Sequence, residues 1–114
     1  MFDFQKLEVY KKAKLFHLTC KDVILTRPLD QYVKDQLGRA SFSVPLNIAE
    51  GSGKFSRADR RNYFTTSRAS AMECVAIADI LAETGVLNKN EFEDLILQAD
   101  ELSRMLYAMI KNLS

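Results

Sequence analysis

The chain has 114 residues, enough for a single domain over residues 1–114 with one hydrophobic core. Hydrophobic residues make up 47% and charged residues 27%, and only 2 Pro and 4 Gly are present, so a turn-rich β fold is disfavoured and helices are favoured. A net charge of +1 gives no global attraction to nucleic acid or to an anionic membrane, so any such binding requires a local patch. The charged N-terminal residues contain no long apolar run, and we therefore expect no signal peptide, no membrane anchor and a cytoplasmic protein.

Apolar residues recur at spacings of three and four along four stretches of the chain, which predicts four helices. Short connections between four such helices favour an all-α fold, an up-down-up-down four-helix bundle. Ser56 with Asp59, and Asn88 with Glu91, have the spacing of N-terminal capping pairs, and Gly85 is expected to stop the third helix. The expected helices cover about residues 7–25, 30 to 51 or 53, 56–84 and 88–113, with residues 51–53 forming the exit turn of the second helix.

The second helix is apolar on two opposite faces. Such a helix is either enclosed by its own domain or shared between the core and a partner subunit. Pro45 lies in its middle, and because the apolar pattern continues past this residue we predict a kink rather than a break. One face consists of Val33, Leu37, Ala40, Val44 and Ile48, the opposite face of Phe42, Leu46, Ala49 and Gly53, and the first helix adds a smaller second strip of Leu15, Leu18 and Leu25.

The motif Ser43-Val-Pro-Leu-Asn-Ile-Ala-Glu-Gly-Ser-Gly53 resembles that of a family of small bacterial four-helix-bundle proteins. Genes of this family were first noticed in intervening sequences of large-subunit (23S) ribosomal RNA genes. The resemblance covers nearly the whole chain. Further segments that resemble family positions, in family order, are residues 4–13, 36–40 and 68–73, Phe64 and the turn that contains Gly85.

The resemblance implies a left-handed up-down-up-down bundle that assembles into a ring of five. A relative of similar fold, the accessory variability protein of diversity-generating retroelements, forms a basic ring that binds nucleic acid and a reverse transcriptase. The residues that we assign to a structural motif or subunit interface on this basis are Arg39, Ser43, Pro45, Asn47, Glu50, Gly51 and Phe64.

A polar line of Arg39, Ser43, Asn47 and Glu50 runs between the two apolar faces of the second helix. Arg39 and Glu50 are eleven residues apart, about three helical turns, so their partners must come from elsewhere. We consider Arg68 as a partner for Glu50, and the Asn47 amide as a donor to the carbonyl left free by Pro45 or to a neighbouring backbone. Either these groups are structural contacts, the commoner case, or they line a shared binding cleft.

The second candidate site is a basic cluster: Lys54, Arg57, Arg60, Arg61 and Arg68. With Asp59 the only acidic residue between positions 52 and 68, the local net charge is +4. Repeated around a ring, this cluster could follow a phosphate backbone. The more common alternative is a set of solvated arginines paired with Asp59 and Glu73. Basic residues at the start of a helix oppose its dipole, which indicates that something other than the stability of that helix placed them there.

Catalysis has little support in this sequence. The single histidine, His17, lacks an orienting acid, and we expect it to pack in the core or an interface. Cys20 and Cys74 lie on apolar stripes and are expected to be buried thiols rather than a disulfide or reactive group. We expect no cofactor, metal or small-molecule substrate. The leading interpretation is a non-catalytic homopentamer that binds RNA or a ribonucleoprotein, and the alternative is a protein-binding scaffold with no nucleic-acid role.

Overall fold

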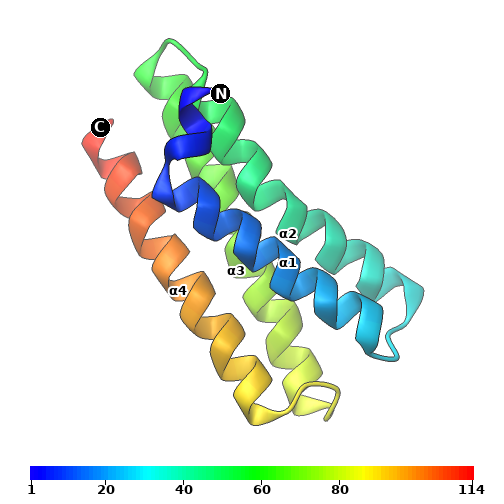
Figure 1. The fold of residues 1–114 in the computed structure, drawn as a ribbon. Helices are drawn as coiled ribbons and strands as arrows, with labels where there is room; N and C mark the ends of the chain where they lie inside the picture. The colour runs from blue at the N-terminus through cyan, green and yellow to red at the C-terminus, as the bar shows by residue number, and fades with distance from the viewer.

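The computed structural model describes residues 1–114 as four long α-helices that pack side by side along a common axis (Figure 1). There are no strands, so the predicted all-α class is confirmed. A short 3-10 helix precedes the first α-helix and was not predicted. The elements are η1 (Asp3–Lys6), α1 (Glu8–Thr26), α2 (Gln31–Ser52), α3 (Arg57–Glu83) and α4 (Lys89–Asn112).

Each α-helix packs against two neighbours: α2 lies against α1 and α3, and α4 lies against α3 and α1. The molecule measures 44 × 23 × 22 Å. One end of the bundle holds both chain termini and the α2–α3 turn, while the other end holds the α1–α2 and α3–α4 turns (Figure 1). No helix is both long enough and apolar enough to cross a membrane.

The predicted local signals set the helix ends. The Ser56 hydroxyl accepts a hydrogen bond from the Asp59 amide at 3.0 Å, which caps α3. Asn88 and Glu91 form a complete capping box at the start of α4, with bonds of 2.8 and 3.1 Å. Gly85 follows α3 with φ of +82°, a conformation that glycine adopts without a Cβ clash. These three predictions are confirmed.

The helix α2 runs through Pro45 without interruption, as the continuous apolar pattern predicted. One of its two apolar faces enters the core, where Val44 and Ile48 have no exposed surface. The other face lies at the surface, with Phe42 51% and Leu46 44% exposed. The smaller strip on α1 is also at the surface, and its three leucines are Leu15, Leu18 and Leu25.

The core consists of 19 buried apolar residues contributed by all four α-helices and the α3–α4 turn. Cys20 and Cys74 are part of it as free thiols, which confirms their predicted burial. The pKa of Cys74 is raised far above its usual range by a hydrogen bond with Cys20 and by burial. Two buried serines are satisfied by backbone carbonyls: Ser67 donates to Val44 at 2.8 Å and Ser41 to Gly38 at 3.3 Å.

Candidate nucleic-acid interface

The basic cluster lies at the end of the bundle that holds the chain termini, on the α2–α3 turn and the first half of α3. The Nζ atom of Lys54 lies 5.1 Å from the centre of the Tyr63 ring, and Arg60 Nε donates to the Lys54 carbonyl at 2.6 Å. None of the five cluster residues forms an ion pair. Their side chains bond to neutral carbonyls or lie over aromatic rings, so their positive charges are not neutralised by carboxylates.

Two arginines of the cluster reach across to the end of α4. Arg57 Nη2 donates to the Asn112 carbonyl at 2.7 Å, and Arg61 Nη1 donates to the Leu113 carbonyl at 2.6 Å. The last carbonyls of a helix lack partners within the helix and carry the negative end of its dipole, so cations stabilise them. The positive charges of Arg57 and Arg61 therefore oppose the dipole of α3 but stabilise the end of α4. This gives the two arginines a structural reason to be there.

Arg68 faces α4 rather than α2. Its Nε donates to the Ser103 carbonyl at 3.1 Å, and its guanidinium lies 5.6 Å from the centre of the Tyr107 ring. The proposed pairing of Arg68 with Glu50 is therefore wrong, because the neighbouring positions Ser67 and Ser70 face α2 and Arg68 lies a further part-turn around the helix.

The proposed ion pairs between the cluster and Asp59 or Glu73 are also absent. Glu73 instead accepts a hydrogen bond from Gln36 Nε2 at 2.8 Å, which joins α3 to α2. The arginines thus have a structural role, but it is not the pairing with carboxylates that we expected. The arginines stabilise carbonyls at the end of α4, and their charge is left unpaired.

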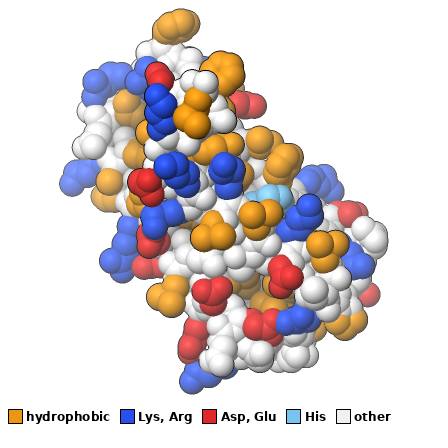
Figure 2. Space-filling view, viewed as in Figure 1, with side chains coloured by type: hydrophobic (Ala, Val, Ile, Leu, Met, Phe, Trp, Pro, Cys, Tyr) orange, Lys and Arg blue, Asp and Glu red, His pale blue; other side chains and the backbone are white.

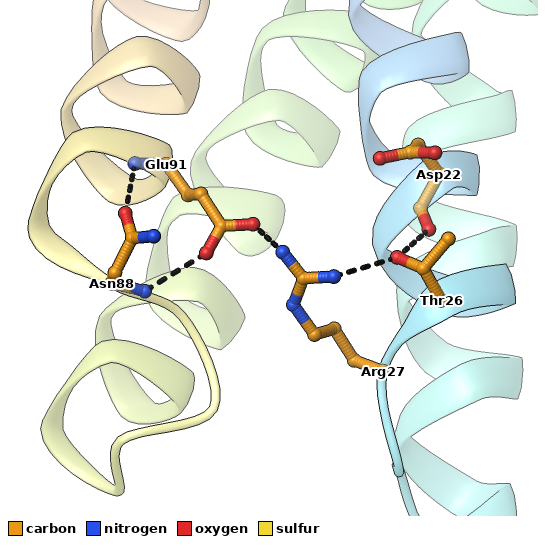
Figure 3. A network of polar contacts seen from close by, with 5 residues as sticks. All are labelled: Asp22, Thr26, Arg27, Asn88 and Glu91. Carbon is orange, nitrogen blue, oxygen red and sulfur yellow. Dashed lines mark hydrogen bonds and ion pairs between the residues drawn. The ribbon is translucent and has the colours of Figure 1, made fainter.

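At the opposite end of the bundle an arginine is neutralised. Arg27, just after α1, forms an ion pair with Glu91 of α4 and also donates to Thr26 Oγ1 at 2.9 Å (Figure 3). Thr26 in turn donates to the Asp22 carbonyl at 2.7 Å. Because Glu91 also closes the capping box with Asn88, this network ties the end of α1 to the start of α4.

Acidic residues are concentrated toward that end. Residues 69–103, here called the acidic segment, contain eight Asp or Glu and only one basic residue, Lys89. Figure 2 shows more Lys and Arg side chains over the end with the termini, while toward the other end acidic and basic side chains are mixed. The net charge of +1 therefore conceals a separation of charge between the basic cluster and the acidic segment.

One residue of the polar line of α2, Ser43, bonds to α3. Ser43 Oγ lies 2.9 Å from Ser70 Oγ of α3. Asn47 Nδ2 donates to the Ser43 carbonyl at 2.9 Å and to its hydroxyl at 2.8 Å. We predicted that the Asn47 amide would bond to the carbonyl of Ser41, which Pro45 leaves without a donor, or to the backbone of a neighbour. It bonds instead to Ser43, one turn before Asn47 in α2. Arg39 and Glu50, at the ends of the line, are exposed and form no ion pair.

Gly51 and Phe64, both assigned to the structural motif, are brought together where α2 ends and α3 begins. Phe64 is only 4% exposed, and a Cβ atom at position 51 would lie 2.8 Å from its Cε1 atom. The absence of a side chain at Gly51 thus makes room for the Phe64 ring. This fixes the approach of α2 to α3 directly below the turn that carries Lys54.

His17 is a packing residue in the structure, as expected. Its Nδ1 atom lies 2.9 Å from Ser41 Oγ, and its ring centre is 5.1 Å from that of Phe42. Partial burial, with a smaller contribution from the positive charge of Lys21, lowers the pKa of His17. No three His, Cys, Asp or Glu side chains come together as a metal site would require.

An apolar groove between α3 and α4, which the sequence pattern did not indicate, has a volume of about 460 Å³. Met72, Val75 and Phe92 are among its lining residues, with Asp79 and Asp100 also part of the lining. It lies in the acidic segment and contains no residue of the basic cluster. Helical periodicity placed Val75 on the apolar stripe of the third helix and Phe92 and Ile96 on that of the fourth, and it gave no sign that a groove opens to solvent between them.

The sequence model of the 23S rRNA-intervening sequence protein family matches residues 5–108. The chain belongs to this family. The match includes the whole Ser43–Gly53 motif and every residue of the basic cluster. The resemblance first indicated by that motif is therefore confirmed.

A solved structure of similar fold comes from Bacteroides thetaiotaomicron VPI-5482, a protein of unknown function from the S23 ribosomal protein family. The two chains superpose with a TM-score of 0.85 at 22% sequence identity, and the alignment covers 90% of this chain and 98% of the other. At this identity the similarity establishes the fold. No curated protein matches the sequence.

Proposed function

We propose that this family member is a non-catalytic interaction module that binds RNA, alone or within a ribonucleoprotein, through the basic cluster. The observation that carries the proposal is that five basic residues on the α2–α3 turn and the first half of α3 form no ion pair: Lys54, Arg57, Arg60, Arg61 and Arg68. A guanidinium has five N–H donors, and the bonds to α4 carbonyls occupy only some of them. The remaining donors and the full charge are available to phosphate oxygens.

Charge separation strengthens this proposal. A polyanion is attracted to the end that holds the basic cluster and repelled by the acidic segment, so it is oriented even though the net charge is only +1. Near-neutral composition is therefore compatible with local binding of a phosphate backbone. Such binding depends steeply on salt concentration, because each neutralised phosphate releases condensed counterions.

We infer further that the protein assembles with copies of itself, as a homopentamer of left-handed up-down-up-down bundles. Support for self-association comes from the exposed apolar side chains of α1 and α2, among them Leu18, Phe42 and Leu46. The number five and the hand of the bundle follow from the family resemblance. Light scattering of the purified protein, with absorbance at 260 and 280 nm recorded on the same peak, measures the assembly mass and any bound nucleic acid together.

The experiment that tests RNA binding compares two variants with equal loss of positive charge. The first replaces Arg57, Arg60 and Arg61 by Ala, and the control replaces Lys21, Lys34 and Lys89 by Ala. Affinity for a single-stranded RNA is measured for both variants and the wild type over a range of salt concentrations. We expect the arginine variant to bind more weakly with a log–log salt slope reduced by about 2, and the control to remain close to wild type.

Two controls make the comparison decisive. Because Arg57 and Arg61 also bond to the end of α4, circular dichroism and urea unfolding establish that the arginine variant is folded at the temperature of the assay. Equal affinities and salt slopes for the folded arginine variant and the wild type would contradict the proposal. Equal losses in the two variants would mean that RNA responds to overall charge and not to the basic cluster.

We assign the protein to the cytoplasm and give it no catalytic role, cofactor or small-molecule substrate. Support for the absence of catalysis comes from His17, the one histidine, which packs against Ser41 and Phe42.

A protein-binding scaffold is the second candidate function, and the α3–α4 groove favours it because an apolar groove can hold a helix of another protein. Partners that remain bound after nuclease treatment, together with unchanged behaviour of the arginine variant, would support the scaffold.

A further inference from the structure

Phe55 projects from the α2–α3 turn with its whole side-chain surface exposed, 100% by area. The backbone on both sides of it is held in place. The Lys54 amide donates to the Gly51 carbonyl at 3.2 Å, the Lys54 carbonyl accepts from Arg60, and the Ser56 carbonyl accepts from the Arg60 amide at 3.1 Å. The ring therefore stands on a well-anchored turn, and no neighbouring side chain covers it.

A hollow of about 390 Å³ lies beside the same turn. Its lining residues are Ser52 and Gly53 at the end of α2 and Phe2, Asp3, Phe4 and Leu7 of the N-terminal segment. The Phe2 and Phe4 rings are stacked, with centroids 6.0 Å apart, and Phe2 is 74% exposed. Exposed aromatic rings are thus found together with the unpaired charges of the basic cluster at one end of the bundle.

We propose that this turn binds unpaired nucleotides of RNA, with one base stacked on the ring of Phe55 and a neighbouring base in the hollow beside Phe2. This inference rests on the proposed RNA binding and specifies the structural class of RNA. Lys54 precedes Phe55 directly and Arg57 follows two residues later, so phosphates on either side of a stacked base lie within reach of a cation. Alternation of aromatic and basic residues is the arrangement that proteins use for single-stranded nucleic acid.

Duplex RNA cannot make the same contacts with Phe55. In an A-form helix each base is already stacked on its neighbours, and the deep, narrow major groove does not admit side chains. A projecting phenylalanine then finds no free base to stack on, and only the phosphate contacts remain. Single strands, loops and bulges offer bases that can be splayed out onto the ring.

The test measures the affinity of the full chain for a labelled single-stranded RNA and for a duplex of the same length and composition, by fluorescence anisotropy at low salt. The variants are Phe55→Ala, Phe55→Leu and Phe55→Trp. Leucine keeps an apolar side chain without an aromatic face, and tryptophan enlarges the aromatic face. The matched control is Tyr32→Leu, which removes an aromatic ring that is 74% exposed on α2 at the opposite end.

We expect Phe55→Ala and Phe55→Leu to weaken binding of the single strand by at least about fivefold, while Phe55→Trp binds as tightly as the wild type or more tightly. Affinity for the duplex stays the same in all variants, and Tyr32→Leu changes neither affinity. An RNA with 2-aminopurine is a second readout: we expect its fluorescence to change on binding to the wild type, as the base leaves its neighbours in the strand, and to change less on binding to Phe55→Leu.

Different failures have different meanings. If Phe55→Leu binds the single strand as tightly as the wild type does, while the arginine variant binds it weakly, the stacking inference is wrong and the proposed RNA binding stands. Equal loss on single strand and duplex would also overturn it. If the wild type binds neither RNA, both proposals are wrong, and Phe55 and Phe2 become candidates for a protein contact. Because Phe55 has no buried surface, its variants are expected to unfold at the same urea concentration as the wild type, which rules out misfolding as a cause.

Discussion

Gly51 lies so close to Phe64 that a Cβ atom at position 51 would be 2.8 Å from the Cε1 atom of the ring. The same Cβ would also lie 2.8 Å from Cβ of Tyr63, an atom close to the backbone that cannot move aside cheaply. The end of α2 and the start of α3 therefore meet through a glycine. This contact sets the geometry of the turn on which Lys54 and Phe55 stand.

Gly51→Ala is expected to lower the free energy of unfolding by about 1–3 kcal/mol, because the added methyl group overpacks the contact with Phe64. The measurement is urea unfolding followed by circular dichroism. Gly53→Ala is the matched control: a Cβ there would lie 3.6 Å from the nearest atom, the Glu50 carbonyl oxygen, and we expect a change within about 0.5 kcal/mol. Wild-type stability of Gly51→Ala would show that the two helices separate easily at this point.

Much of the fold was predictable because its signals are local. Ser56, Gly85 and Asn88 mark helix ends through interactions with residues only a few positions away, and the apolar spacing continued through Pro45. The buried thiols of Cys20 and Cys74 followed from the same spacing. The short η1 helix was missed, because its cap involves the Phe2 backbone and Gln5 and lacks the usual Ser, Thr, Asp or Asn signal.

The candidate site was predictable in its residues but not in its contacts. Five basic residues close together in sequence indicated a cluster, yet the partners of Arg57, Arg61 and Arg68 lie 35 to 56 positions later in the chain. These partners depend on how the end of α4 lies beside the start of α3. The acidic segment could have been found by counting charges along the sequence, but its place toward the end of the bundle opposite the basic cluster depends on how the helices pack.

Arg57 and Arg61 should each contribute to stability as well as to binding. Arg57→Ala and Arg61→Ala are each expected to lower the free energy of unfolding by about 0.5–1.5 kcal/mol, since each removes a charged donor to the carbonyls at the end of α4. Arg61 is the less exposed of the two and should have the larger effect. Arg39→Ala, at an exposed position without an ion pair, serves as control and should change stability by less than about 0.5 kcal/mol. If Arg57→Ala and Arg61→Ala both unfold at the same urea concentration as the wild type, these arginines do not stabilise the end of α4.

The stability of the protein should depend on pH through His17. The pKa of His17 is lowered in the folded protein, so the unfolded chain binds the proton more tightly. The stabilisation is therefore complete above the unfolded pKa of about 6.5 and is lost as pH falls through the folded pKa. Urea unfolding at a series of pH values between about 5 and 8 should show this loss in the wild type and a flatter profile in His17→Gln. Parallel profiles would indicate that other groups cause the dependence.

Cys20 and Cys74 should be unreactive in the native protein. The hydrogen bond with Cys20, together with burial, raises the pKa of Cys74, so the reactive thiolate is scarce at neutral pH. A disulfide reagent such as Ellman's reagent is expected to label both thiols in guanidinium chloride, but in native buffer only as fast as the protein opens. The variant Thr65→Cys supplies an exposed thiol on α3 as a control and should react at once. Immediate labelling of the wild type would place a thiol outside the core.

The position of bound RNA on the protein is the most direct test of the proposed function. Irradiation of the complex with an RNA that contains 4-thiouridine, followed by mass spectrometry of the cross-linked peptides, identifies the residues in contact. Binding through the basic cluster predicts cross-links within residues 52–68, with Phe55 and Tyr63 the foremost candidates. Cross-links concentrated in the acidic segment, or a pattern that persists unchanged when Arg57, Arg60 and Arg61 are replaced by Ala, would contradict it.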